Sequence, residues 1–285
     1  MKKMKKDNFF KPSVTVDCIL FTIRNDKSEN YKKLPEKKLQ VLLVKRAEEP
    51  FKNGWCLPGT FVRETERFED SVNRVLEEKT NLKNIYLEQL YSWGDPLRDP
   101  RDRVISTSYM GLIDSNNIQI KAGKNVDDIK WFDVKVNVLK DENKTKKYGY
   151  YKTEELEIIL ECKNITLKSR LKVVKELRNG NLIIYTEILK SDLAFDHAKM
   201  LIYAIERLKN KVEYTTIAFN LMPEKFTLTN LQHVYEILLD KPLLKANFRR
   251  KIADMVIETE DYEESAGHRP SKLYRFNTEW QPHIF

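Results

Sequence analysis

The first 135 residues of the chain alternate between short apolar runs and polar connections. Five strand-like runs occupy residues 13–23, 39–45, 85–92, 103–113 and 129–134. Between the second and third runs, residues 66–80 repeat apolar side chains at helical spacing, with Phe68, Val72 and Leu76 on one face. The pattern therefore predicts mixed sheet and helix in this half of the chain.

The next region, residues 137–192, is more polar. Its first part, residues 137–153, is rich in Lys and Asn and predicts a loop. Strand-like runs follow at 155–162, 167–175 and 181–189. Gly180 stands between two Asn residues, which is typical of a hairpin turn. We therefore expect a region of strands inserted after the first sheet.

The C-terminal part changes to helical periodicity after Asp192, with a second helical group expected near Tyr214. Thr227 stands at the N-cap of the next helix, whose apolar stripe stops at Pro242. A further helix is expected over residues 244–255. Strand candidates follow at 256–258 and 272–276. Three helices, a strand, a loop and a strand are the order of a winged helix.

The charge balance permits an anionic partner without proving one. The 285-residue chain is 33% charged and has a formal net charge of +8. Residues 214–285 nevertheless contain nine Lys or Arg against ten Asp or Glu, so DNA binding must depend on local clusters. No apolar run is long enough for a membrane span, and no apolar segment follows the N-terminal lysines. Three isolated cysteines favour the reducing cytoplasm, and we expect a cytoplasmic protein without a membrane partner.

Residues 55–82 resemble the Nudix box, and the register holds without gaps on Gly59, Glu66, Arg74 and Glu78. In that box, glutamates at helical spacing share one face and hold Mg²⁺, which binds the diphosphate and activates water. The equivalent positions here are Val75, Glu78 and Lys79. Thr60 and Asn81 replace two glycines. A shifted register using Glu77 and Glu78 loses the Arg and loop matches.

We therefore expect a Nudix fold without a metal site or catalytic residues, in which Glu66 and Glu78 are residual. Residues 94–103 add three arginines and two prolines, which suits either a phosphate-binding loop or a solvated turn. The neighbouring Asp196 and His197 start a helix, and we assign them no chemistry.

Several phrases along the whole chain resemble the Nudix-related transcriptional regulators of NAD metabolism. The matching phrases begin at Trp55, Gly94, Leu193, Phe226, Asn247 and Arg269. The resemblance implies an α+β protein with an N-terminal Nudix α/β/α sandwich and a C-terminal winged helix-turn-helix domain. It also implies a repressor, usually dimeric, that senses ADP-ribose or a related nucleotide. Some relatives respond to sugars instead.

On this basis we expect a flexible basic arm over residues 1–12, an effector-binding domain over 13–210 with its inserted strands at 137–192, and a DNA-binding domain over 211–285. The candidate effector-binding residues are Arg46, Phe51, Trp55, Phe61, Arg63 and Arg101. The candidate DNA-binding residues are Thr227, Thr229, Lys245, Asn247, Arg249, Arg250, Lys251, His268, Arg269 and Lys272.

The favoured hypothesis is a homodimeric regulator that needs no cofactor and binds double-stranded DNA and a nucleotide or sugar metabolite. A second hypothesis is an ADP-ribose-type pyrophosphatase with an unusual metal site using Glu66 and Glu78. A third is a nucleic-acid-binding adaptor without a small-molecule effector.

Overall fold

The computed structural model describes residues 10–25, 37–83, 85–114, 120–123, 126–263 and 270–281. Most of the predicted arm and the wing residues His268 and Arg269 lie outside these ranges. One large sheet forms the centre. Its strands are β1 (Ser13–Asn25), β2 (Lys37–Arg46), β3 (Trp55–Cys56), β4 (Gly59–Phe61), β5 (Tyr86–Trp93), β6 (Val104–Leu112), β7 (Val126–Lys146), β8 (Gly149–Cys162), β9 (Ile165–Arg178) and β10 (Asn181–Ser191). The main order is β10-β9-β8-β7-β2-β1-β6-β5, with β3 and β4 paired to β2 and β1.

Strand β1 is buried on both faces, which explains its continuous apolar run. Because successive side chains alternate across a strand, Val16, Cys18 and Leu20 belong to the core beneath α1 (Phe68–Thr80). Ile19 and Phe21 belong to the opposite core, which contains α2 (His197–Lys211). The predicted α/β/α sandwich is therefore confirmed.

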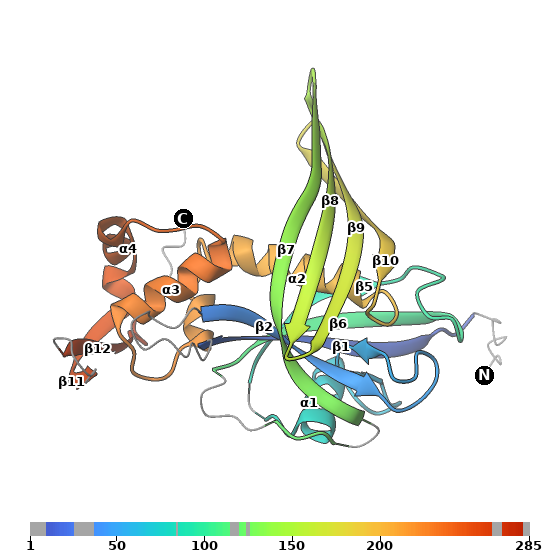
Figure 1. Ribbon diagram of the computed structural model, residues 1–285, viewed down its shortest axis with the longest axis horizontal. Helices are drawn as coiled ribbons and strands as arrows, with labels where there is room; N and C mark the ends of the chain where they lie inside the picture. Colours follow the sequence, from blue (N-terminus) through green and yellow to red (C-terminus); the bar gives the residue numbers. More distant parts are fainter. Residues whose placement is uncertain are drawn as a thin grey trace, which may run out of the picture.

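Strands β7 to β10 extend away from this body as a twisted four-stranded blade (Figure 1). The predicted loop at 137–153 is wrong, because β7 and β8 pair out to Lys146 opposite Gly149, with one register shift between Val138 and Lys140. Within residues 137–153 no side chain is buried, and cross-strand ion pairs link the strands instead, such as Lys152 Nζ to Asp141 Oδ2 at 3.2 Å. This polar sequence was mistaken for a loop because no alternation marks a strand that is solvated on both faces.

The C-terminal part is a winged helix. It contains the 3-10 helices η2 (Ile217–Leu221) and η3 (Ala253–Met255), the helices α3 (Leu228–Leu239) and α4 (Lys245–Ile252), and the hairpin of β11 (Val256–Glu263) and β12 (Ser271–Phe276). The predicted N-cap is present, since Asn230 N donates to Thr227 Oγ1 at 3.1 Å. The group expected near Tyr214 is only a short 3-10 helix.

The sandwich and the winged helix share one hydrophobic core. Phe21 of β1, Leu201 of α2, and Leu231 and Phe248 of the winged helix are all buried in the same cluster. Lys37 Nζ at the start of β2 also donates to Asn230 Oδ1 in α3 at 3.1 Å. The two parts are therefore packed together rather than joined by a free linker. In the described ranges, no helix is long and apolar enough to cross a membrane.

Candidate functional site

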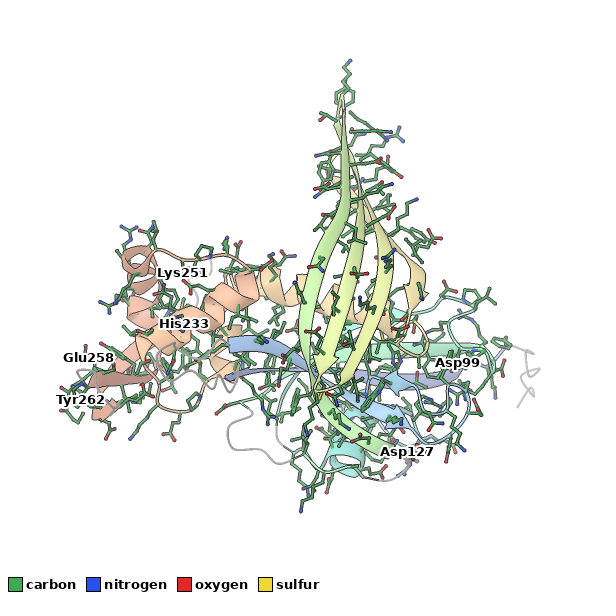
Figure 2. All side chains as sticks on the ribbon, viewed as in Figure 1. Asp99, Asp127, His233, Lys251, Glu258 and Tyr262 are labelled. Atoms are coloured by element: carbon green, nitrogen blue, oxygen red, sulfur yellow. The ribbon has the colours of Figure 1, made fainter. Side chains whose placement is uncertain are left out.

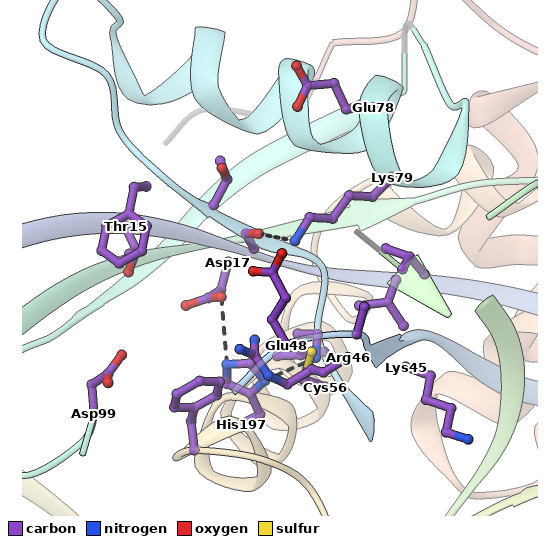
Figure 3. Close-up of a pocket in the computed structure, with 18 of the residues that line it drawn as sticks. Thr15, Asp17, Lys45, Arg46, Glu48, Cys56, Glu78, Lys79, Asp99 and His197 are labelled. Carbon is purple, nitrogen blue, oxygen red and sulfur yellow. Dashed lines mark hydrogen bonds and ion pairs between the residues drawn. The ribbon is translucent and has the colours of Figure 1, made fainter. Parts of the chain in front are cut away.

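A cavity of about 370 Å³ opens where the Nudix-like box meets the centre of the sheet (Figure 3). Its walls come from β1, the end of β2, the β3–β4 segment, α1, the 94–103 loop and the start of α2. The lining residues are Thr15, Asp17, Val44, Lys45, Arg46, Ala47, Glu48, Cys56, Leu57, Gly59, Thr60, Phe61, Arg63, Glu78, Lys79, Arg98, Asp99, Arg101, Val126, Phe195 and His197. Six Lys or Arg side chains face four Asp or Glu, which leaves an excess of two positive charges. The lining favours an anionic ligand.

Arg98 is anchored in the cavity floor by two aspartates that lie far away along the chain. Its Nη2 and Nε lie 2.8 and 3.0 Å from the carboxylate oxygens of Asp196, and Nη2 is 3.6 Å from Asp17 Oδ2. All three side chains are less than a tenth exposed. Ser106 Oγ donates to Asp17 as well. A bidentate pair with further hydrogen bonds is the geometry that a buried guanidinium needs.

His197 completes this floor. Its Nδ1 accepts a hydrogen bond from the backbone N–H of Leu57 at 3.0 Å, and its Nε2 lies 3.6 Å from Asp17 Oδ1. Burial lowers the pKa of His197, although Asp17 and Asp196 act in the opposite direction. A neutral ring is also what the Leu57 contact requires, because Nδ1 must carry a lone pair. Asp196 and His197 thus have definite structural contacts beside the cavity.

The two residual glutamates of the box are held by arginines. Arg74 Nε lies 2.7 Å from Glu66 Oε1, and the same guanidinium lies 3.6 Å from Glu78 Oε2. Arg63 approaches Glu66 and Glu78 at 3.6 and 3.8 Å. Hydrogen bonds, chiefly from Arg74, lower the pKa of Glu66 to about 2. Both carboxylates are therefore already paired with guanidinium groups.

These residues do not fit a Mg²⁺ site. Val75 is fully buried in the core below α1. Lys79 lines the cavity, where its Nζ donates to the carbonyl of Gly59 at 2.6 Å. Mg²⁺ needs several oxygen ligands, and the described ranges contain no group of three or more His, Cys, Asp or Glu placed for a metal.

Four of the six predicted effector residues line the cavity, namely Arg46, Phe61, Arg63 and Arg101. Phe51 stands outside the lining, and its ring contacts Phe195 edge-on at 4.8 Å between centroids. Trp55 also lies outside the lining. Its indole is buried against Phe132 at 4.9 Å, so the structure assigns Trp55 to the core.

Phe195 and Phe61 give the cationic cavity two aromatic surfaces. The guanidinium of Arg101 lies 5.3 Å from the Phe61 centroid, and that of Arg46 lies 5.0 Å from the Phe195 centroid. Asp99 fixes Arg101 by a 2.7 Å contact. Rings and guanidinium groups held in this way offer flat surfaces for stacking as well as charge.

Sequence reasoning missed Asp17, Arg98 and Phe195 as cavity residues. Phe195 and the partner of Arg98, Asp196, lie in the phrase Leu193–His197, which was noted only as a resemblance. Asp17 is an acidic residue inside an apolar strand. A charged residue at such a position was the available signal, since buried carboxylates are found with partners.

Helix α4 presents a second cationic surface. Lys245, Asn247, Arg249 and Arg250 are exposed, whereas the buried Phe248 contacts Tyr235 of α3 at 5.2 Å. Arg250 Nη2 donates to Asn247 Oδ1 at 3.1 Å. The structure therefore brings four predicted DNA-binding side chains together on one solvent-facing helix.

The remaining predicted DNA-binding residues either make contacts within the protein or lie elsewhere on the winged helix. Lys251 Nζ donates to the Glu213 carbonyl at 2.9 Å, and Lys272 lies over the Tyr262 ring. Thr229 is exposed at the start of α3, while the Thr227 side chain is buried as its N-cap. Figure 2 labels Lys251 on the winged helix and Glu258 and Tyr262 on the wing.

Comparison with known proteins identifies two domain families in the chain. Residues 33–153 match the NUDIX domain family, and residues 218–276 match the NrtR DNA-binding winged helix domain. The ADPR-responsive transcriptional repressor NtrR of Acinetobacter baylyi is 30% identical over 97% of this chain and 86% of its own length.

Two solved structures share both parts. The Shewanella oneidensis NrtR structure in complex with a 27mer DNA has a TM-score of 0.62 and 30% identity, covering 93% of each chain. A MutT/nudix family protein from Enterococcus faecalis has a TM-score of 0.66 and 26% identity, covering 96% of this chain and 90% of its own. Both likenesses extend across the sandwich, the blade and the winged helix.

Proposed function

Because the chain belongs to the NrtR family of Nudix-related transcriptional regulators, we propose that it is a DNA-binding repressor released by ADP-ribose in the cavity. The observation that carries this proposal is the cationic, aromatic-walled cavity in a Nudix domain that shares its core with a winged helix. The likeness to a repressor described as ADPR-responsive supports ADP-ribose as the effector.

The cavity suits a nucleotide diphosphate better than an uncharged sugar. Arg46, Arg63 and Arg101 are proposed to bind phosphate oxygens, for which guanidinium groups have the matching geometry. Phe61 is proposed to stack on the base or ribose. Phe51 and Trp55 are proposed to support the cavity wall from behind. Phe51 does so through its ring contact with Phe195. An uncharged sugar would use neither the charge nor the bidentate geometry of these guanidinium groups.

Helix α4 is the proposed recognition helix. Asn247 suits adenine, while Arg249, Arg250 and Lys245 suit guanine or phosphate. Thr229, with the backbone N–H groups that follow Thr227, is proposed to contact phosphate at the start of α3. Lys251 and the wing residues His268, Arg269 and Lys272 are proposed to contact the DNA backbone.

The Nudix domain is proposed not to hydrolyse its ligand. Val75 contributes no oxygen, Lys79 brings a positive charge, and both remaining glutamates are paired with arginines. The described residues include no group of three or more His, Cys, Asp or Glu that could hold a metal to activate water. Incubation with ADP-ribose and Mg²⁺ should therefore release no AMP, and AMP release abolished by Glu78→Gln would support the pyrophosphatase hypothesis.

We propose a homodimer formed through β10. This edge strand pairs with β9 alone among the described strands and exposes about half of each of several large apolar side chains. These are Leu182, Ile183, Ile184, Tyr185 and Leu189. An uncovered apolar edge favours strand pairing, and a second copy offers the same strand across a two-fold axis. Light scattering should detect a dimer, which Ile183→Lys should dissociate and Leu97→Lys, on the exposed 94–103 loop, should not.

The repressor proposal is tested by gel shift with DNA from upstream of the protein's own gene, at fixed salt because affinity depends on ionic strength. A specific complex that ADP-ribose dissociates is the expected result. A specific complex unaffected by ADP-ribose would contradict the effector, and Arg249→Ala with Arg250→Ala should prevent the complex from forming.

A further inference from the structure

Lys79 occupies a metal-ligand position of the Nudix box. Its side chain is positively charged, as the metal is, whereas the box has a negatively charged glutamate at this position. The residue lies on α1 beside Glu78, and both line the cavity. Figure 3 shows His197 joined to Asp17, while the ammonium group of Lys79 reaches the Gly59 carbonyl on the other side. The ammonium group is therefore in the part of the cavity that the box assigns to the diphosphate.

The ammonium group has unused hydrogen-bonding capacity. Lys79 Nζ donates to the Gly59 carbonyl at 2.6 Å, and this is its one acceptor in the described part of the chain. An ammonium group has three N–H donors, so two remain for a ligand. Gly59 cannot be replaced without disturbing this arrangement, because a Cβ there would collide with the Asp17 carboxylate.

The surrounding charges keep this cation available rather than neutralised. The negative charge of Asp17 acts to raise the pKa of Lys79, but the carboxylate oxygens of Asp17 contact Arg98 and Ser106. Glu78, on the same helix, is paired with Arg63 and Arg74. Burial lowers the pKa of Lys79, and no carboxylate among the described residues contacts its ammonium group directly. A diphosphate oxygen would supply the missing partner.

We propose that Lys79 replaces the divalent metal of the Nudix site, so that the cavity binds a diphosphate without Mg²⁺. This inference rests on the proposed effector function and adds how the diphosphate is held. A fixed ammonium group neutralises phosphate oxygens, but it cannot activate water as a bound metal does. The same residue therefore allows binding and prevents turnover, as a sensor requires.

The test is calorimetric titration of the full chain with ADP-ribose, once with EDTA and once with Mg²⁺. The wild-type dissociation constant should change by less than about twofold between the two buffers. Lys79→Gln, which can still donate to the Gly59 carbonyl, should weaken binding at least about tenfold in both buffers. Lys79→Arg should retain metal-independent binding, because it keeps the charge.

The matched control is Lys83→Gln, since Lys83 follows α1 and pairs with Glu77 on the exposed side. It should bind as the wild type does. Circular dichroism checks that each variant is folded. The charge reversal Lys79→Glu should bind ADP-ribose only when Mg²⁺ is present, and Mn²⁺ titration followed by electron paramagnetic resonance should detect metal in this variant but not in the wild type.

The outcomes separate this inference from the proposed effector. Wild-type binding that requires Mg²⁺, or a Lys79→Gln variant that binds normally, would overturn the role of Lys79 and leave the effector in place. If the wild type binds no ADP-ribose, inorganic pyrophosphate is titrated in the same two buffers. Pyrophosphate binding in EDTA would support Lys79 while removing ADP-ribose, and no binding of either anion would overturn both.

Discussion

The cavity and helix α4 are both rich in arginine, but they use it in opposite ways. Arg98 in the cavity is almost fully buried and is fixed by two aspartates. Arg249 on α4 is exposed and has no carboxylate contact within the described ranges. In Figure 2, Asp99 beside the cavity and Lys251 at the end of α4 mark opposite sides of the molecule.

This difference matches the two ligands proposed. A small anion needs charges whose positions are fixed before it binds, and buried ion pairs fix them at the cost of desolvation. DNA is a long array of phosphates that exposed side chains approach through counterion release. The free energy of unfolding should therefore depend on Arg98 in the cavity. The salt dependence of DNA affinity should depend on the exposed cations of α4.

The largest effect is expected from Arg98→Met. This change leaves Asp17 and Asp196 buried without their guanidinium, and breaking a buried pair costs about 3–5 kcal/mol. Urea unfolding should record this loss. Arg249→Met, the same substitution on α4, should change the free energy of unfolding by less than about 0.5 kcal/mol. Equal losses at the two sites would remove the distinction between them.

A smaller effect, confined to DNA binding, is expected from α4. Replacing Arg249 and Arg250 together by Ala should lower the slope of log affinity against log salt by about 0.9 for each lost phosphate contact. Lys251→Ala should change the slope less, because Lys251 is already bound to the Glu213 carbonyl. Fluorescence anisotropy at several salt concentrations gives these slopes. A larger change in slope for Lys251→Ala than for the arginine pair would contradict the prediction that Arg249 and Arg250 make the main DNA contacts.

The smallest effect is expected from pH. Burial lowers the pKa of His197 in the folded protein, with Arg98 and Arg46 acting in the same direction and Asp17 and Asp196 against it. The unfolded chain, with a histidine pKa of about 6.5, then binds more protons, so the protein loses stability as pH falls below that value. Urea unfolding at pH 7.5 and 5.5 should show this loss, reduced in His197→Asn.

The sequence predicted the sandwich and the winged helix well, because a buried element leaves a recognisable pattern of apolar residues. Helix α1 has one apolar face, and β1 is apolar on both faces, so each has a recognisable pattern. Residues 137–153 of the blade have neither one apolar face nor a continuous apolar run. Residues 137–153 form strands there because long cross-strand pairing replaces burial, and nothing in a single strand's sequence reveals its partner.

The cavity was predictable where its residues lie in one motif. Gly59, Lys79 and Glu78 were located by the box alone. Arg98 was missed because its partners, Asp17 and Asp196, come from the first strand and the start of α2. Trp55 was misplaced for the opposite reason. Adjacent to the motif in sequence, it turns to the other side of the strand and packs against Phe132.

The hydrophobic core that the sandwich shares with the winged helix affects how such proteins can diversify. Leu231 and Phe248 of the winged helix are buried in the same cluster as Phe21 of the central sheet. A recombination event that exchanged the C-terminal part alone would cut through this cluster and expose apolar surface on both fragments. New operator preferences are therefore more accessible through point changes on the outer face of α4, which contributes nothing to the shared interior, than through transplanted domains.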